Sequence, residues 1–306
     1  MRCWSLAALL VASSFFSTSH AAEGGLSNYI PGFYGDVGVA LLPPEGLSVR
    51  NDIFYYNGDI EGSVRSGEIL IDLEATLVYD YFTMLYNPGI ELLRGHLAFG
   101  ATPTLGRVDI GADVTSGNLS RGVSEDRSGI GDITFAGNVY WPGEKWHFMW
   151  ANFLVAPVGR YDADDLANIG LNYWTFETDV AATYFNAETG QDYSIVVGYG
   201  YNTENEDTDY KSGDEFHVDV VLNQFFSDSF GVGLSGYFYR QLSGDTGEGA
   251  FLGDFKGEGA GIGPGFYYIR QGRDRDVYFS LKWIHDFDVE NRPEGDYVYA
   301  SVSFNW

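Results

Sequence analysis

Apolar and polar residues alternate with a period of two along most of this chain. The clearest example is segment 297–306, where one parity holds Val298, Ala300, Val302, Phe304 and Trp306. The other parity holds Tyr297, Tyr299, Ser301, Ser303 and Asn305. Successive side chains of a β-strand point to opposite faces, so each such segment has one apolar and one polar face. The alternation predicts an all-β fold.

About twelve segments of this kind follow one another, each near the length that crosses a bilayer as a tilted strand. Their approximate centres are Asp52, Leu77, Ala101, Phe135, Ala151, Asp179, Val197, Val220, Tyr237, Phe266, Leu281 and Val302. In the segment around Leu77 we expect Leu73, Leu77 and the other odd-numbered apolar residues to face outward. The apolar parity changes between Leu105 and Val108, which predicts a β-bulge near Gly106.

Short and long connections take turns along the chain. Short turns are expected at 141–146, 227–229 and 271–275, whereas long acidic connections are expected at 58–67, 115–128, 159–171, 203–213, 243–258 and 288–295. Outer-membrane barrels have short periplasmic turns and long external loops, and an even strand number returns both ends to the periplasm. We therefore predict one transmembrane antiparallel β-barrel of about twelve strands, over 47–306, with both termini periplasmic.

A soluble β-sandwich also alternates and is the alternative fold. Aromatic residues favour the barrel, because many lie near strand ends, where they would form girdles at the membrane interfaces. Examples are Tyr79, Tyr81, Phe82, Trp141 and Trp146. The final strand also ends on an aromatic residue, Trp306, as the assembly signals of such barrels do.

The first residues predict export. Arg2 precedes an apolar run from Trp4 to Phe16, and Ser19-His20-Ala21 matches a signal-peptidase site, so residues 1–21 are expected to be removed. The only cysteine, Cys3, lies within them, which excludes disulfides from the mature chain. Segment 22–46 is rich in Gly and Pro. Its aromatic residues predict that it packs inside the lumen, with a flexible periplasmic tail as the alternative.

The chain is strongly acidic, with a formal net charge of −26 from 17 basic and 43 acidic residues. Loss of Arg2 with the signal peptide makes the mature chain one unit more negative. Such a surface repels nucleic acid. The 22 Tyr, 22 Phe and 7 Trp residues provide too much apolar surface for a disordered chain.

Several motifs along the mature chain resemble a family of bacterial outer-membrane proteins named for a part in the meta pathway of phenol degradation. They are Leu26-Ser27-Asn28-Tyr29-Ile30-Pro31-Gly32, Leu42-Pro43-Pro44-Glu45-Gly46, Ala156-Pro157-Val158-Gly159-Arg160-Tyr161-Asp162 and Tyr201-Asn202-Thr203-Glu204-Asn205, with Tyr239-Arg240-Gln241 and Gly263-Pro264 after them. Each motif is weak alone, but their order and spacing are specific. The resemblance implies uptake of hydrophobic or aromatic compounds, and it transfers no catalytic residues.

On the barrel interpretation, the polar faces line an enclosed lumen that is predominantly anionic. The candidate lumen-lining and ligand residues are Asp52, Asp72, Glu74, Asp80, Asp132, Glu177, Asp179, Glu215, His217, Asp219, Lys282, Tyr297 and Tyr299. The functional hypothesis is a cation-favouring pathway, with tyrosines that stack on planar substrates. The structural alternative is that these residues fill and hydrogen-bond a narrow interior.

Enzymatic chemistry has weak support. The mature chain has four histidines, His96, His147, His217 and His285, but it contains neither a Gly-x-Ser-x-Gly motif nor a His-Glu-x-x-His motif. No cofactor or metal is implied, and the acidic loops do not match an EF-hand.

We therefore predict an outer-membrane channel or transporter for small molecules or ions, with hydrophobic or aromatic compounds as the substrates that the resemblance implies. The alternatives are a structural or adhesive barrel and, with less support, a lipid hydrolase. Expected partners are outer-membrane lipid, lipopolysaccharide and the barrel assembly machinery.

Overall fold

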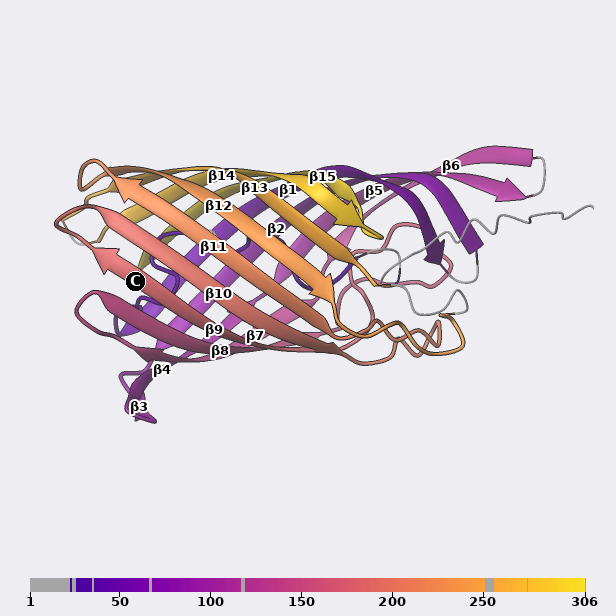
Figure 1. Cartoon of the computed structure of the whole chain (residues 1–306). Helices are drawn as coiled ribbons and strands as arrows, with labels where there is room; N and C mark the ends of the chain where they lie inside the picture. Colours follow the sequence, from indigo (N-terminus) through magenta and orange to yellow (C-terminus); the bar gives the residue numbers. More distant parts are fainter. Residues whose placement is uncertain are drawn as a thin grey trace, which may run out of the picture.

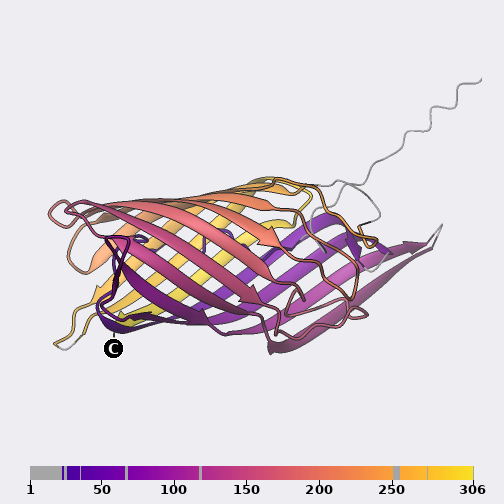
Figure 2. The same ribbon diagram turned by 90° about the horizontal axis from the view of Figure 1, so that it is seen from below.

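The computed structural model describes residues 23, 26–34, 36–65, 68–116, 119–250, 256–273 and 275–305. In this part of the chain antiparallel strands form one elongated barrel, seen from the side in Figure 1 and from below in Figure 2. No helix found there is long and apolar enough to cross a membrane. The expected signal peptide, residues 1–21, and the final Trp306 lie outside the described residues.

The strands are numbered in chain order. They are β1 (Gly46–Arg65), β2 (Glu68–Asn87), β3 (Glu91–Leu92), β4 (Gly95–Thr102), β5 (Thr104–Ser116), β6 (Leu119–Ile130), β7 (Ile133–Trp141), β8 (Trp146–Ala156), β9 (Thr175–Asn186), β10 (Gln191–Asn202), β11 (Glu215–Phe225), β12 (Phe230–Gln241), β13 (Glu258–Arg270), β14 (Val277–Glu290) and β15 (Glu294–Asn305).

The sheet closes on itself because its last strand pairs with its first. β15 pairs with β1, and β2 pairs with both β4 and β5 in a single register, with Met84 opposite Ala101 and Tyr81 opposite Thr104. β4 and β5 therefore form one wall strand that is interrupted at Pro103, and β6 and β7 form the next. The two-residue β3 pairs only with β4. The wall thus has twelve strands, which confirms the predicted antiparallel barrel.

The outer surface carries an apolar band over most of the strands. Its exposed residues include Ile53, Val78, Phe82, Phe99, Phe135, Phe148, Trp150, Phe176, Val180, Ile195, Val220, Leu222, Leu234, Ile262, Phe266, Phe279, Leu281 and Trp283. A closed barrel pairs every backbone group within the wall, so this surface can face lipid without unsatisfied hydrogen bonds. The two stacked sheets of a sandwich would have buried these side chains.

The two ends of the barrel differ. The turns at 141–146, 187–190 and 226–229, and residues 271–273 and 275–276, lie at one end with the C-terminal strand end, here called the turn end. Irregular connections at 157–174, 203–214, 242–250 and 256–257 lie at the other, called the loop end.

The expectation of long loops at 58–67, 115–128 and 288–295 is wrong. β1 continues to Arg65 and β2 begins at Glu68, while β5 continues to Ser116 and β6 begins at Leu119. Likewise, β14 runs to Glu290 and β15 begins at Glu294. Polar residues there continue strand pairing past the apolar band, and the β5–β6 hairpin projects beyond the barrel (Figure 1).

The faces of β2 are the reverse of those expected. Leu73 and Leu77 point into the barrel and are 5 % and 7 % exposed, whereas Glu74 is on the outer surface. Register explains this orientation, because Tyr79 lies opposite the buried Phe54 of β1 and directly opposed residues share a face. Both faces of this strand carry apolar residues, so the alternation alone did not identify the outer one.

The expected bulge near Gly106 is also absent. Ala98, Thr104, Val108 and Ile110 are all buried even-numbered residues, so the inward parity continues through both β4 and β5. Val108 and Ile110 are apolar side chains that face the interior. The register irregularity of this strand pair lies instead between Ile71 and Glu74 of β2.

The first prediction tests the outer face. Val180 on β9 is 58 % exposed within the apolar band, and we expect Val180→Arg to reduce the free energy of unfolding by about 2–4 kcal/mol, because a cation near the middle of a bilayer is poorly solvated. The matched variant is Asn57→Arg, at an exposed outward position of β1 closer to the loop end, where we expect about 0–1 kcal/mol. Urea unfolding in lipid vesicles measures both. Equal losses would contradict the assignment of a lipid-facing band.

Candidate functional site in the barrel interior

Three adjacent strands, β9, β10 and β11, build the most polar part of the inner wall. Gly198 of β10 lies opposite Asp179 of β9 on one side and opposite His217 of β11 on the other. Their side chains share the inner face for that reason. A Cβ atom on Gly198 would lie only 2.0 Å from His217 Nε2, so the glycine gives the imidazole the room to lean across β10.

His217 lies among three carboxylates. Its Nδ1 is 2.9 Å from Asp219 Oδ2, and its Nε2 is 3.5 Å from both Glu177 Oε1 and Asp179 Oδ1. His217, Asp179 and Asp219 are each at most 1 % exposed. Next along the same faces, Glu215 accepts a hydrogen bond from Asn202 Nδ2 at 3.2 Å.

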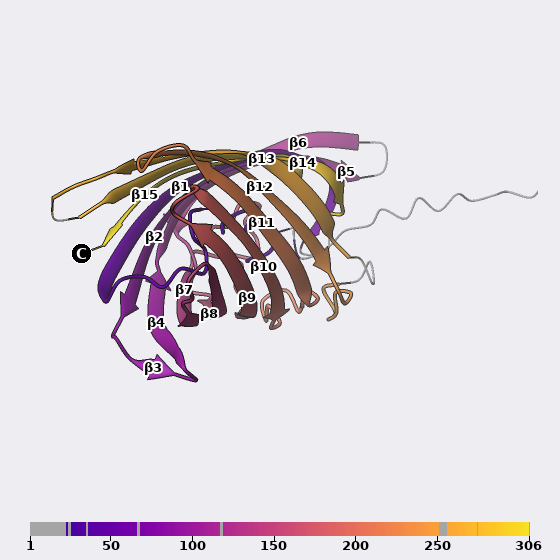
Figure 3. The same ribbon diagram turned by 60° about the vertical axis from the view of Figure 1, so that its left-hand side comes forward.

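The N-terminal segment, here residues 26–44, lies inside the barrel (Figure 3). Its backbone N–H groups donate to wall side chains: Gly32 to Asp219 at 3.2 Å, Gly38 to Asp192 at 2.8 Å and Ala40 to Thr183 at 3.0 Å. Gly32 has a φ of +70°, and a Cβ there would lie 2.1 Å from Ile284 Cδ1. The segment is therefore closely packed against the wall.

Two tyrosines of the N-terminal segment extend this contact. The Tyr29 hydroxyl donates to Asp219 at 3.1 Å, and the Tyr34 hydroxyl donates to Asp179. The Tyr29 ring also stacks on His217, with the ring centroids 4.1 Å apart. The carboxylates of the polar wall thus find many of their partners in the N-terminal segment.

Glu23 and the N-terminal segment that follows it reach opposite ends of the barrel. Glu23 bonds to Ser212 and Asn205 of the loop end, whereas Pro43 accepts a hydrogen bond from Asn87, where β2 reaches the turn end. The expectation that both termini lie at one end is therefore wrong for the described chain. Only the start of β1 and the end of β15 lie together at the turn end.

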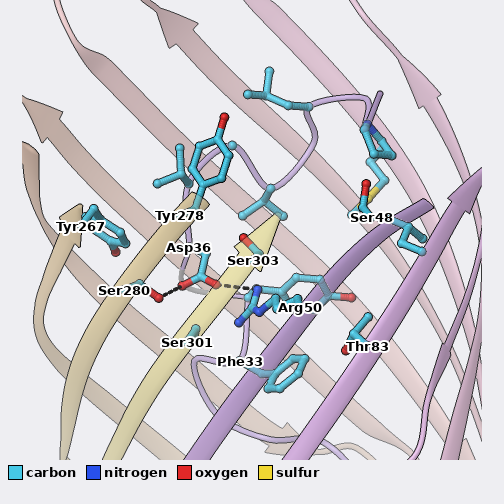
Figure 4. A pocket seen from close by; sticks show the side chains of 18 of the residues that line it. Phe33, Asp36, Ser48, Arg50, Thr83, Tyr267, Tyr278, Ser280, Ser301 and Ser303 are labelled. Atoms are coloured by element: carbon cyan, nitrogen blue, oxygen red, sulfur yellow. Dashed lines mark hydrogen bonds and ion pairs between the residues drawn. The ribbon is translucent and has the colours of Figure 1, made fainter. Parts of the chain in front are cut away.

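A second charged group lies across the lumen. Asp36 of the N-terminal segment forms ion pairs with Arg50 of β1 and with Lys282 of β14, and accepts a hydrogen bond from Ser280 at 3.1 Å. Arg50 also binds Asp52 through two nitrogens. Figure 4 shows Asp36 between Ser280 and Arg50.

Aromatic side chains fill the middle of the lumen. Tyr297 and Tyr299 of β15 are 6 % and 0 % exposed and pack against Phe54 with centroid distances of 6.2 and 5.2 Å. The same cluster includes Tyr29, Tyr56, Tyr79, Tyr81, Tyr237 and Tyr239, with Leu73, Leu77, Val108, Ile110 and Ile284. The Tyr299 hydroxyl donates to the carbonyl of Pro31, and Lys282 Nζ lies 4.8 Å from its ring centroid. The interior of the barrel is thus a packed core in this region.

A cavity of about 960 Å³ lies beside the N-terminal segment. It extends from Glu177 to the turns at 187–190 and 225–228, so it occupies the turn half of the barrel. Its wall includes the aromatic side chains of Phe33, Tyr34 and Phe153 and the charged side chain of Arg50. The arrangement offers a chamber for a small molecule that has an apolar body and a polar group.

The loop end is covered by connections that bond to one another. Asn205 Nδ2 donates at 2.8 Å both to the Tyr161 hydroxyl and to Glu23, and Arg127 of β6 forms an ion pair of 2.9 Å with Asp165. Burial and the adjacent Asp245 carboxylate raise the pKa of Tyr210, whose hydroxyl donates a hydrogen bond to Asp245.

Three of the candidate lumen residues lie elsewhere. Glu74 is exposed on the outer face of β2, and Asp80, on the same face, accepts a hydrogen bond from Asn51. The prediction that Glu74 and Asp80 line the lumen is wrong, because β2 turns the opposite face inward. Asp132 lies between β6 and β7, where it accepts hydrogen bonds of 2.9 Å from the backbone of Gly159 and Leu171 and so positions the loop. The side chain of Asp72 lies outside the described residues.

The remaining candidates, Asp52, Glu177, Asp179, Glu215, His217, Asp219, Lys282, Tyr297 and Tyr299, all face the interior. Sequence reasoning missed Asp36, Asp192, Asp286 and Phe54 as interior residues. Asp192 and Asp286 follow the inward parity of β10 and β14, so a register through each whole strand would have found them. Asp36 lies in an irregular segment that has no periodic signal.

No histidine forms a hydrogen bond to a serine within the described residues. The partners of His217 and His285 are carboxylates. This geometry lacks the serine–histidine pair on which a hydrolase of the triad type depends.

The closed twelve-stranded wall and apolar band define an outer-membrane β-barrel with a filled, polar-walled interior. A similar solved structure is the COG4313 outer membrane channel from Pseudomonas putida F1, with a TM-score of 0.66 and 16 % identity over 88 % of this chain and 98 % of that one. A Pseudomonas aeruginosa FadL homologue gives a TM-score of 0.47 and 9 % identity over 93 % and 99 % of the two chains. No curated protein matches the sequence.

The model of the family described as "Putative MetA-pathway of phenol degradation" matches residues 59–302. The chain belongs to this family.

The second prediction tests the anchor between the N-terminal segment and the wall. Tyr29→Phe removes one donor from the buried Asp219 carboxylate, and a hydrogen bond to a charged group contributes about 1.5–3 kcal/mol. We expect a loss of that size in the free energy of unfolding. The control is Tyr55→Phe, whose ring is 41 % exposed on the outer face, with an expected change within about 0.5 kcal/mol. Equal effects of the two variants in urea unfolding would contradict the anchor.

Proposed function

We propose that this protein is an outer-membrane channel for small hydrophobic or aromatic compounds. The observation that carries the proposal is the cavity of about 960 Å³ inside a closed, lipid-facing barrel. Its walls combine aromatic rings with a few polar groups, as sites for planar apolar molecules do. Membership of a family named for phenol degradation supports the same substrate class. In this proposal the turn end faces the periplasm and the loop end faces outside.

The charge of the interior gives the channel a preference among ions. Carboxylates outnumber cations on the inner wall and the N-terminal segment: Asp36, Asp52, Glu177, Asp179, Asp192, Glu215, Asp219 and Asp286 lie there with Arg50, Lys282 and Arg292. A narrow pathway lined in this way favours cations over anions.

The N-terminal segment acts in this proposal as the element that restricts passage. It bonds to β9, β10, β11, β14 and β15, so it is held across the lumen, and it also forms part of the cavity wall. A solute that crosses the barrel must pass beside it or displace it. Bulk diffusion of the kind seen in wide porins is not expected.

One observation favours a structural or adhesive barrel as the second candidate. The aromatic cluster, which includes Tyr29 of the N-terminal segment, fills the lumen on the loop-end side of the cavity. The loop-end connections also bond to one another. A barrel of that kind would not conduct. Lipopolysaccharide and the barrel assembly machinery remain proposed partners for either function.

The third prediction concerns conductance. We expect the wild-type protein in planar lipid bilayers to show a small, cation-preferring conductance, and deletion of residues 26–40 to increase it severalfold, because the deletion removes the chain that occupies the lumen. Tyr29→Phe combined with Tyr34→Phe removes two anchors without shortening the chain and should change conductance in the same direction.

Matched variants test the charge assignment. Glu177→Gln borders the cavity and should weaken the cation preference, whereas Glu74→Gln on the outer face should leave it unchanged. Uptake of a monoaromatic compound into vesicles tests the substrate class directly. Absence of both conductance and uptake would favour the structural barrel, and an anion preference at neutral pH would contradict the interior assignment.

A further inference from the structure

Three potential metal ligands converge on one point of the inner wall. Glu177 and Asp179 of β9 and His217 of β11 each offer one ligand atom, and these three atoms lie within 4.8 Å of one another. His217 Nε2 is 3.5 Å from each of the two carboxylate oxygens. The ligands come from β9 and β11, which β10 separates in the sequence, so no linear sequence motif identifies them.

Two of the three separations between these atoms match a small metal ion. Zinc binds imidazole nitrogen and carboxylate oxygen at about 2.0–2.2 Å, so two ligands of one tetrahedral ion lie about 3.4 Å apart. The nitrogen-to-oxygen separations of 3.5 Å leave room for such an ion between them. These distances are longer than direct hydrogen bonds, whose usual range ends near 3.2 Å.

Two of the ligand atoms lack hydrogen-bond partners. His217 Nε2 and Asp179 Oδ1 are fully buried and have no hydrogen-bond partner, on side chains that are 1 % and 0 % exposed. A buried polar atom without a partner costs about 1–3 kcal/mol, and more when the group is charged. Both atoms point at the same space, so a single cation would satisfy them together.

The local charge also calls for a cation. Glu177, Asp179 and Asp219 surround His217, and no Lys or Arg forms an ion pair with these carboxylates within the described ranges. A proton on His217 would supply one positive charge against three carboxylates. A divalent ion supplies two and uses the imidazole nitrogen as a neutral ligand.

Asp219 orients the imidazole of His217 so that its Nε2 atom can bind a metal ion. Its Oδ2 lies 2.9 Å from His217 Nδ1, an arrangement in which the Nδ1 proton is donated to the carboxylate and the Nε2 lone pair faces Glu177 and Asp179. Histidine ligands of metal ions commonly have such a carboxylate behind them. The Tyr29 ring stacked on His217 holds the plane of the imidazole.

An ion can reach the cluster from the cavity. Glu177 lines the cavity and its side chain is 13 % exposed, so one ligand of the cluster is accessible from the cavity.

We propose that Glu177, Asp179 and His217 bind a divalent transition-metal ion of the zinc type, with Asp219 as the residue that positions His217. The imidazole nitrogen favours such an ion over Ca²⁺ and Mg²⁺, which prefer oxygen ligands. Because Tyr34 donates to Asp179 and Tyr29 to Asp219, the bound ion would also stabilise the N-terminal segment in the lumen. Binding of the ion does not require that the barrel conducts.

The fourth prediction is tested with Zn²⁺ on the full chain in detergent. Isothermal titration should show one Zn²⁺ ion per barrel that Ca²⁺ and Mg²⁺ do not displace. Co²⁺ should give the intense visible absorption of a tetrahedral site. Glu177→Gln keeps the shape of the side chain and should weaken Zn²⁺ binding at least tenfold, and Asp219→Asn should weaken it about 10–100-fold through the orientation of His217.

His147→Gln provides the matched control, because His147 also faces the interior but lies outside the cluster. It should bind Zn²⁺ as the wild type does, and the change in electrophoretic mobility on heating shows which variants are assembled. Absence of Zn²⁺ binding by the assembled wild type would overturn the proposal. An affinity unchanged in assembled Glu177→Gln would also overturn it, because the ion would then bind elsewhere, for example in the acidic loops.

Discussion

The buried carboxylates of Asp179, Asp192 and Asp219 impose the constraint on which the interior depends. Closure of the wall removes them from bulk water, and an unpaired buried charge is costly. The N-terminal segment supplies their partners through the hydroxyls of Tyr29 and Tyr34 and through backbone N–H groups. Its path through the lumen is therefore a condition for burying this polar wall.

The same contacts connect stability to function. The segment contributes Tyr29 to the aromatic core and Phe33 and Tyr34 to the cavity wall, so the groups that stabilise the interior also limit what can cross it. A divalent ion beside His217 would tighten the contact at the point where Tyr34 reaches Asp179. Passage, charge selectivity and ion binding would thus depend on one set of side chains.

The sequence identified the inner face of a strand only where one face was polar and the other apolar. In β11, Glu215, His217 and Asp219 alternate with Phe216, Val218 and Val220, and the inner face could be identified. In β2 the inward Leu77 and the outward Val78 and Phe82 are equally apolar, so alternation did not say which face was inside. The interior positions of Tyr79 and Tyr81, first expected in an interfacial girdle, followed only from the pairing with β1.

By itself, the sequence determined the class of fold, the number of wall strands and the acidic character of the interior, because alternation and charge are local properties of each strand. The tertiary structure alone decided which face of β2 turns inward, where the N-terminal segment lies and which side chains meet around His217. These features depend on register between strands and on contacts such as Tyr29 with Asp219, which join residues far apart in the chain. Neither periodicity nor composition contains that pairing.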